Sequence, residues 1–150
     1  MANEIAINGT YRNAEISPYR HRVRYHELDA QGMVHPSHYM NWIENARLDL
    51  LEQIGLGLKQ MENMEILMPM LSNSIEYYSP VKFDDMIVIS TKVTSYDGKQ
   101  IEIAYRIFDE KTGENYAMAK SKHFFTNKSG VPISLVRIYP ELDTTFFEMK

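Results

Sequence analysis

Side chains that could transfer protons or attack a carbonyl gather in one short stretch near the start of the chain. They are His26, Glu27, Asp29, Gln31, His35, Ser37 and His38. Carboxylates and imidazoles are common general acids and bases in enzymes, and a carboxylate can also act as a nucleophile. This stretch, the polar cluster, is therefore the first place to look for an active site.

The polar cluster is predicted to lie between a strand and a long helix. Residues Tyr19–His26 alternate in the way that is typical of a strand, and apolar residues recur at helical spacing over His38–Ile54. Pro36 suits a first helical position, Ser37 is a candidate cap, and Gly55 is a candidate stop. Because N–H groups at the start of a helix favour nearby negative charge, this junction could stabilise an anionic intermediate.

Asp29 is the carboxylate of the polar cluster that is best placed for chemistry. It is a short side chain just ahead of the predicted helix, and Gly32 would let the backbone approach a substrate closely. A plainer interpretation exists, because Asp often stabilises a turn by hydrogen bonding to its own backbone. Position alone therefore leaves Asp29 open between a catalytic role and a turn-forming role.

The rest of the chain predicts antiparallel strands that wrap the helix. The expected elements are strands over Ile66–Tyr78, Asp85–Tyr96, Gln100–Phe108 and Tyr116–Thr126, a hairpin turn at Asp97-Gly98, a short helix or flap over Leu56–Glu65, and a short helix over Pro140–Met149. The apolar stripe of the long helix is so wide that other structure must cover most of its sides. Together these elements predict an α+β fold.

Length and composition predict one domain over residues 1–150, with residues 1–18 as a loose lead-in. The net charge of −4 and the scattered basic residues argue against a nucleic-acid partner. The chain has no cysteine, which excludes disulfides and a thiolate nucleophile. We see no signal-peptide pattern and no apolar run of about 20 residues, so we expect a cytoplasmic protein without membrane contact.

The polar cluster and the helix after it resemble a known family. The stretch Tyr25–Tyr39, followed by Trp42, Glu44, Ala46 and Arg47, is similar to the signature of the 4-hydroxybenzoyl-CoA thioesterase group of hotdog proteins. That signature combines an Asp-x-x-Gly-x-Val turn, here Asp29, Gly32 and Val34, with a Tyr on the first helical turn, here Tyr39. The resemblance implies the hotdog fold, in which a long central helix is wrapped by an antiparallel sheet of about five strands.

The resemblance also implies hydrolysis of an acyl-CoA thioester to a free acid and CoA. In this family a carboxylate, which falls on Asp29, attacks the carbonyl or activates water, and helix N–H groups stabilise the oxyanion. Gly32, Val34 and Tyr39 would contact the substrate, and Lys99 aligns with a basic position that serves the CoA phosphates. The family uses no metal and no cofactor, and it forms homodimers or homotetramers with sites at subunit interfaces.

Three positions depart from the family pattern. Pro36 occupies the place of the N–H that polarises the thioester carbonyl, and because proline has no N–H the donor is expected to move to Ser37. His35 could orient water or the acyl group, and His38 could hydrogen-bond to the loop that carries Asp29. For both histidines an exposed or helix-capping role is the alternative.

Other roles in the chain stay open. Glu44 is the second candidate for the catalytic carboxylate, although an ion pair with Arg47 three residues later is the plainer expectation. Glu27 is expected to support the site or to face solvent. The methionine-rich run over residues 61–70 could shape an acyl pocket or form ordinary core, and Tyr39 could likewise be core.

Two alternative functions are also compatible with the sequence. One is a thioesterase that acts on an acyl carrier protein, whose acidic surface would favour a basic rim that this negatively charged chain does not suggest. The other is a protein that binds acyl thioesters without hydrolysing them, which Pro36 favours. A metal site built from His26, Asp29, His35 and His38 is the least favoured interpretation, because no HExxH pattern is present.

Overall fold

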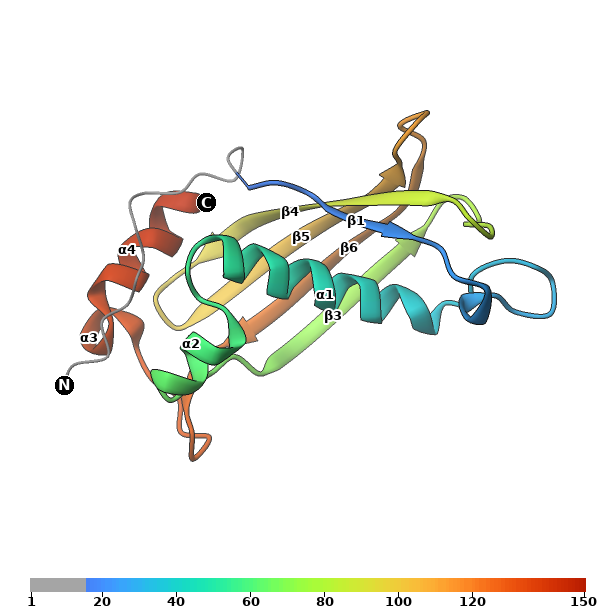
Figure 1. The fold of residues 1–150 in the computed structure, drawn as a ribbon. Coiled ribbons are helices and arrows are strands. Elements are labelled where there is room, and N and C mark those ends of the chain that lie inside the picture. Colours follow the sequence, from blue (N-terminus) through green and yellow to red (C-terminus); the bar gives the residue numbers. More distant parts are fainter. Residues whose placement is uncertain (1–15) are drawn as a thin grey trace.

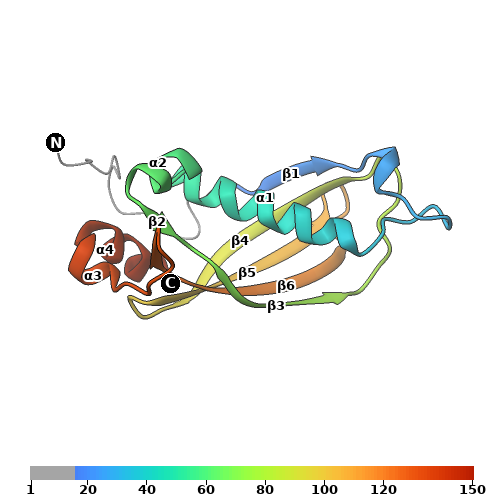
Figure 2. The same ribbon diagram turned by 90° about the horizontal axis from the view of Figure 1, so that it is seen from below.

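The computed structural model describes residues 16–150, in which a long helix lies across one face of a five-stranded antiparallel sheet (Figure 1). The helix is α1 (Ser37–Gln53), and the strands are β1 (Tyr19–Arg22), β3 (Met70–Tyr77), β4 (Met86–Tyr96), β5 (Gln100–Asp109) and β6 (Asn115–Phe124). Figure 2 shows the sheet curving beneath α1. The predicted α+β arrangement, a long helix wrapped by about five strands, is therefore confirmed.

The strand order β1-β4-β5-β6-β3 leaves β1 and β3 at the two edges of the sheet. β4, β5 and β6 form consecutive hairpins, and β3 returns to pair with β6. Six of the eight residues of β3 are exposed, so both faces of this edge strand are largely uncovered in the single chain. An exposed edge presents unpaired backbone N–H and C=O groups and favours pairing with another strand.

The core lies between α1 and the concave face of the sheet. α1 packs mainly against β4 and β1. Its fully buried residues, which include Trp42, Leu50 and Leu51, meet inward-facing isoleucines such as Ile89 and Ile103. Burying a large apolar side chain contributes about 1.5–3 kcal/mol, so this contact fixes the position of α1 and of its N-terminus.

The first predicted strand is shorter than the sequence indicated. β1 ends at Arg22, and Tyr25–Glu27 form a short 3₁₀ helix, η2, instead of continuing the strand to His26. The Glu27 carboxylate accepts the N–H of Arg24 at 2.7 Å, which turns the chain at this point. Tyr25, which alternation placed on the same face as Val23, is 80% exposed while Val23 is buried.

Two other predicted strands are divided. The strand expected over Ile66–Tyr78 is interrupted at Met68 and Pro69, which leaves β2 (Ile66–Leu67) and β3 as separate strands. Proline cannot donate to a strand ladder, and it ends the pairing there. The strand expected over Tyr116–Thr126 likewise divides into β6 and β7 (Thr126–Asn127), and β7 pairs with β2 in a small second sheet.

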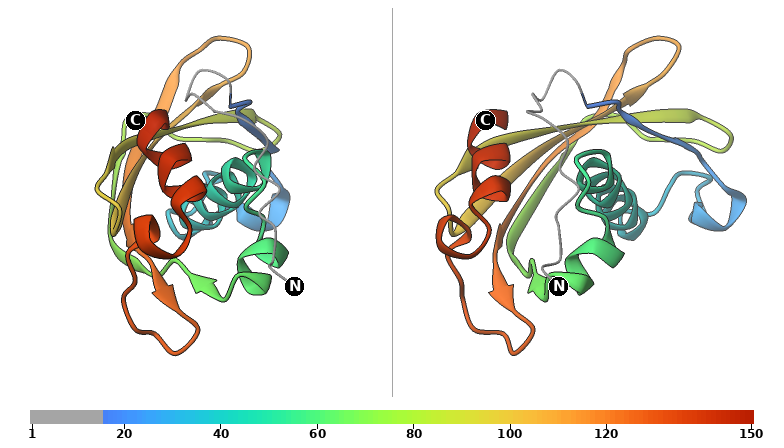
Figure 3. Two further views of the ribbon diagram at one scale, coloured as in Figure 1. Left: turned by 90° about the vertical axis from the view of Figure 1, so that its left-hand side faces the viewer. Right: turned by 60° about the vertical axis from the view of Figure 1, so that its left-hand side comes forward.

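Short helices complete the fold. The ambiguous Leu56–Glu65 stretch contains α2 (Leu58–Asn63), and the chain ends with α3 (Leu135–Ile138) and α4 (Pro140–Met149), the last with the predicted bounds. Figure 3 shows α3 and α4 at the end of the sheet that carries the β4–β5 hairpin. Within residues 16–150, no helix has the length and apolar character needed to cross a bilayer.

Most of the expected lead-in, residues 1–15, lies outside the described part of the chain. Ser17, which is described, exchanges two hydrogen bonds with the Gln53 side chain at the end of α1, at 2.8 and 2.9 Å. The last residues of the expected lead-in are therefore attached to the helix.

Candidate functional site

The loop between η2 and α1 is a narrow hairpin held by backbone hydrogen bonds. The N–H of Asp29 donates to the carbonyl of Met33 at 2.7 Å, and the N–H of Gly32 donates to the carbonyl of Asp29 at 3.1 Å. Gly32 has a φ of +77°, a left-handed conformation that glycine adopts without strain. The N–H of Val34 donates to the carbonyl of Val81 at 2.9 Å, which attaches the loop to the segment after β3.

Asp29 combines the turn-forming role with a free carboxylate oxygen. Its Oδ1 atom accepts the N–H groups of Gln31 at 2.8 Å and Met33 at 3.2 Å. Within the described residues both of its hydrogen bonds go to Oδ1, and the side chain is only half-buried. The turn therefore holds the carboxylate in a fixed orientation and leaves Oδ2 available to a substrate or a water molecule.

Glu27 is buried, and its carboxylate receives three hydrogen bonds. The donors are the N–H of Arg24 at 2.7 Å, Nε1–H of Trp42 at 2.5 Å and, when Nε2 carries a proton, His21 at 2.8 Å. Burial raises the pKa of Glu27, but His21, the Arg24 N–H and Trp42 together outweigh it, so the pKa lies below its usual value. The possibility that Glu27 faces solvent is excluded, since the residue is 4% exposed.

The N–H groups of the first turn of α1 are all engaged. The N–H of Ser37, the expected oxyanion donor, lies 3.2 Å from Nδ1 of His35, and the hydroxyl of Ser37 lies 2.9 Å from the same atom. The N–H groups of His38 and Tyr39 donate to the carbonyls of His35 and Pro36 at 3.0 and 3.2 Å. Ser37 is the first helical residue and makes no capping bond, so the prediction that it caps the helix was wrong.

The aromatic residues beside this turn face the core or each other. The ring of His38 lies edge-on to the ring of His26, with centroids 6.1 Å apart, and among the described residues no hydrogen bond joins the His38 side chain to the Asp29 loop. Tyr39 is 3% exposed and packs against Trp42 and Tyr77. Burial, with a smaller contribution from Tyr77, raises the pKa of Tyr39 to about 12. This environment favours the packing interpretation of Tyr39.

Comparison with known proteins places the chain in a family. A family model described as the thioesterase-like superfamily matches residues 23–142. The chain belongs to this superfamily. In Bacillus subtilis, the protein named "Putative acyl-CoA thioesterase YneP" is 29% identical over 129 residues, which are 85% of this chain and 93% of that protein.

Two further comparisons agree with this assignment. The Escherichia coli acyl-CoA thioester hydrolase YbgC is 30% identical over 86 residues, 57% of this chain and 64% of that protein. The crystal structure of a DHNA-CoA thioesterase from Staphylococcus aureus superposes with a TM-score of 0.82 at 26% identity, covering 88% of this chain and 89% of that chain. The predictions of a hotdog fold and of a thioesterase enzyme are therefore confirmed.

In this thioesterase, Lys99 lies far from Asp29. Lys99 follows the Asp97-Gly98 turn at one end of β4, and the Asp29 loop lies at the other end (Figure 1). β4 has 11 residues, which corresponds to about 35 Å in a strand. Lys99 lines a cavity of 840 Å³ together with Arg137 of α3 and Leu71 of β3. Within one protomer, about the length of β4 therefore separates Lys99 from the Asp29 loop.

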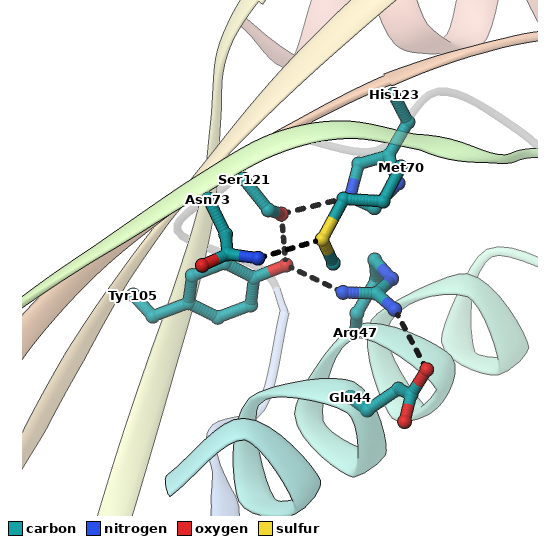
Figure 4. Close-up of polar contacts among 7 residues, drawn as sticks. All are labelled: Glu44, Arg47, Met70, Asn73, Tyr105, Ser121 and His123. Carbon is teal, nitrogen blue, oxygen red and sulfur yellow. Dashed lines mark hydrogen bonds and ion pairs between the residues drawn. The ribbon is translucent and has the colours of Figure 1, made fainter. Parts of the chain in front are cut away.

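A second polar group of the thioesterase, which we call the Arg47 network, is buried between α1 and the sheet (Figure 4). The Arg47 guanidinium contacts the Tyr105 hydroxyl at 3.4 Å, Tyr105 contacts the Ser121 hydroxyl at 2.7 Å, and Ser121 contacts Nε2 of His123 at 2.8 Å. The predicted Glu44–Arg47 ion pair is confirmed at 3.5 Å.

The sequence pattern had not indicated the rest of the Arg47 network. Ser121 and His123 occupy the inward-facing positions of β6, where alternation also places Ala117 and Ala119. Burial, and secondarily the charge of Arg47, lowers the pKa of His123 to about 4, so the ring is neutral near pH 7. The only available signal was a polar residue at an inward position of a strand, and that signal does not specify a partner.

Proposed function

We propose that this thioesterase hydrolyses an acyl-CoA thioester to a free acid and CoA, with Asp29 as the catalytic carboxylate. The observation that carries the proposal is the Asp29 carboxylate on the loop that leads into α1, which the loop orients through Oδ1 while Oδ2 has no hydrogen-bond partner among residues 16–150. The substrate class is supported by the names of YneP, YbgC and the Staphylococcus aureus enzyme.

Two routes through Asp29 are chemically balanced. As a nucleophile, its oxygen attacks the thioester carbon, the C–S bond breaks to release the CoA thiolate, and water then hydrolyses the resulting anhydride. As a general base, Asp29 takes a proton from water while the hydroxide attacks the same carbon, and the proton passes to the departing thiolate. Either route places a negative charge on the carbonyl oxygen, which needs a donor.

The donor in this proposal is the N–H of Ser37, after His35 moves away from it. Pro36 has no N–H, and the N–H groups of His38 and Tyr39 donate to the carbonyls of His35 and Pro36. The contact between the Ser37 N–H and His35 Nδ1 is the one that a side-chain rotation can break, and His35 is exposed. A substrate carbonyl would then replace the imidazole.

The proposal includes a homodimer formed through β3. The Asp29 loop lies near the end of β3, since Tyr39 contacts Tyr77 there, whereas the Lys99 cavity includes Leu71 at the beginning of β3. Pairing two β3 strands antiparallel about a two-fold axis brings the beginning of one beside the end of the other. Lys99 and Arg137 of one protomer could then bind the phosphates of a CoA that reacts at Asp29 of the other.

A protein that binds acyl thioesters without hydrolysing them is the second candidate. It is favoured by the first turn of α1, in which Pro36 lacks an N–H and the following three N–H groups are all engaged. If His35 stays in place, the oxyanion has no donor and turnover would be very slow. A cytoplasmic location and assembly beyond the dimer remain predictions.

The deciding experiment is release of CoA thiol from short, medium, long and aromatic acyl-CoAs by the wild type and by Asp29→Asn. We expect turnover in the wild type and a loss of at least a thousandfold in the variant, because the amide can neither attack nor accept the proton. Asp84→Asn is the matched control, because it makes the same change at an exposed carboxylate. Asp84 has a φ of +68°, a conformation that asparagine also tolerates.

Each other outcome has a distinct meaning. Turnover that survives in Asp29→Asn would transfer the chemistry to Glu44 or His35. Tight binding of acyl-CoA by the wild type without any thiol release would support the non-catalytic candidate.

A further inference from the structure

A cavity of 580 Å³ opens between α1, α2 and the segment around β2. Most of its lining is apolar and comes from Leu48, Leu51, Leu58, Met61, Ile66, Leu67 and Met68. The charged lining residues are Glu44, Arg47 and Glu62. An apolar pocket with a few polar groups is typical of a small-molecule site, and the polar groups in such a pocket fix what it accepts.

Arg47 is the unusual member of this lining, because it is charged and 7% exposed. Within residues 16–150, the polar contacts of its guanidinium are the Tyr105 hydroxyl at 3.4 Å and Glu44 at 3.5 Å. Both distances are long for hydrogen bonds, and a guanidinium has five N–H donors. Removing a charge from water is costly unless close partners compensate. Arg47 therefore retains donors that a ligand in the cavity could use.

The residues behind Arg47 fix its orientation (Figure 4). Arginine can only donate, so the Tyr105 oxygen accepts from it and the Tyr105 hydroxyl can donate to Ser121, at 2.7 Å. Ser121 can in turn donate to Nε2 of His123, which is fully buried and neutral near pH 7. This arrangement places no carboxylate behind the guanidinium. The carboxylate partner, Glu44, is on the solvent side, with its side chain 61% exposed.

The cavity lies on the same face of α1 as the proposed oxyanion donor. At 100° per residue, Ser37, Glu44, Leu48 and Leu51 fall within an arc of about 60°, and Arg47 lies about 40° beyond Leu51 at the border of the same face. The rise of 1.5 Å per residue puts Arg47 about 15 Å from Ser37 along the helix axis, and the arginine side chain leans back toward the helix N-terminus. An acyl group held at Ser37 could follow this face and end at the guanidinium.

We propose that this cavity receives the acyl group and that Arg47 selects acyl groups that carry a carboxylate at the far end. The inference rests on the proposed thioesterase function and specifies its substrate class as a medium-length dicarboxylic monoacyl-CoA. A carboxylate can accept two parallel N–H bonds from a guanidinium, which a methyl group cannot do. The apolar lining would hold the methylene chain, and the distal carboxylate would displace Glu44 from Arg47.

The test compares acyl-CoAs of equal length that differ only at the far end. Adipoyl-CoA is compared with hexanoyl-CoA, and suberoyl-CoA with octanoyl-CoA, in thiol-release assays of the wild type. We expect kcat/KM to favour the dicarboxylic member of at least one pair by about tenfold to a hundredfold, since a hydrogen bond to a charged group is worth about that ratio. Equal rates, or a preference for the alkyl member in both pairs, would overturn the inference without any variant.

Variants then assign the preference to Arg47. Arg47→Met keeps the length and removes the donors, so the ratio within the preferred pair should fall to about one. Arg47→Lys keeps the charge without the fork and should retain part of the ratio. Arg22→Met, at an exposed arginine paired with Asp84, is the control and should leave the ratio unchanged. The melting temperature of Arg47→Met shows whether the variant is folded. If it equals that of the wild type and the ratio is unchanged, the assignment to Arg47 is contradicted.

A binding measurement separates this inference from the proposed reaction. Calorimetry with Asp29→Asn and the same four acyl-CoAs reports the distal preference without turnover. If no acyl-CoA is hydrolysed but the dicarboxylic member binds more tightly and Arg47→Met abolishes the difference, the selectivity stands and the hydrolase proposal fails. If hydrolysis occurs but neither rate nor affinity depends on the distal carboxylate, the selectivity fails and the hydrolase proposal stands.

Discussion

Two carboxylates separated by a single residue occupy very different environments in this thioesterase. Glu27 is buried, and its carboxylate is joined to β1 through His21 and to α1 through Trp42. Asp29 is half-buried on a hairpin, with its hydrogen bonds from the described residues confined to Oδ1. A carboxylate whose oxygens are saturated by the protein can anchor structure, whereas one with a free oxygen can meet a substrate.

The difference follows from which partners each side chain can reach. Glu27 is the buried residue of its 3₁₀ turn, and its longer side chain reaches the indole of Trp42 on α1. Asp29 lies at the start of the hairpin turn, where its short side chain reaches only local N–H groups. We therefore assign the anchoring role to Glu27 and the catalytic role to Asp29, and the experiments below test that division.

The largest expected effect is on the activity of Asp29→Asn. Turnover should fall by at least a thousandfold, equivalent to about 4 kcal/mol or more in the activation barrier. The free energy of unfolding should change by less than about 1 kcal/mol, because an asparagine carbonyl can accept the same two N–H bonds. Thiol release and denaturant unfolding of the same preparation check both statements. A large loss of stability would mean that Asp29 is also an anchor.

The next effect is on the stability of Glu27→Ala. The change leaves the buried Nε1–H of Trp42 and the part-buried N–H of Arg24 without an acceptor, so we expect a loss of about 3 kcal/mol in unfolding free energy. Urea unfolding is the measurement, and Glu52→Ala, an exposed position on α1, is the control with almost no expected change. If Glu27→Ala is stable but inactive, the roles of the two carboxylates are reversed.

Acid unfolding should show the anchor and a second buried group in different pH ranges. Because the pKa of Glu27 is lowered on folding, its ionised carboxylate stabilises the fold above pH 4.5. This contribution is lost as the pH falls through the pKa of Glu27 in the folded protein. The pKa of His123 is lowered from 6.5 to about 4. As the pH falls from 6.5 to 4, the unfolded chain therefore binds a proton at this residue before the folded protein does. The free energy of unfolding should decrease over that interval by about 3 kcal/mol in total.

Variants at these two positions separate the contributions. Unfolding free energies of His123→Leu should lose the slope between pH 6.5 and 4, and those of Glu27→Gln should lose the slope below 4.5. A slope between pH 6.5 and 4 that persists in His123→Leu would mean that another group titrates there.

The smallest effect concerns His35. If this side chain only covers the Ser37 N–H, His35→Ala should keep kcat or raise it by a few fold, because the donor no longer has to be uncovered. Steady-state kinetics with the best acyl-CoA decides the matter, with His26→Ala as an exposed histidine control. A fall in kcat of about a hundredfold or more would instead give His35 a direct role in moving a proton.

The sequence by itself determined the elements whose pattern is strong and local. The apolar stripe predicted α1 to within a residue at each end, and alternation with a hairpin signal predicted β4 and β5. It also placed Asp29 and Gly32 in a turn directly ahead of the helix, since Asp and Gly at this spacing have few other conformational uses. The motif around Asp29 was enough to predict a thioesterase family, and the family model of the thioesterase-like superfamily matches the chain.

Tertiary structure alone decided which polar residues are buried together. Nothing local distinguishes Glu27 from a solvent-facing carboxylate, because its partner Trp42 is 15 residues away, and Arg47 meets Tyr105 across 58 residues. The engagement of Ser37 by His35 and the separation of Lys99 from Asp29 likewise depend on side-chain rotation and sheet length. Hydrogen bonds and burial of this kind are set by distances in space, and periodicity along a chain records only which face a residue occupies.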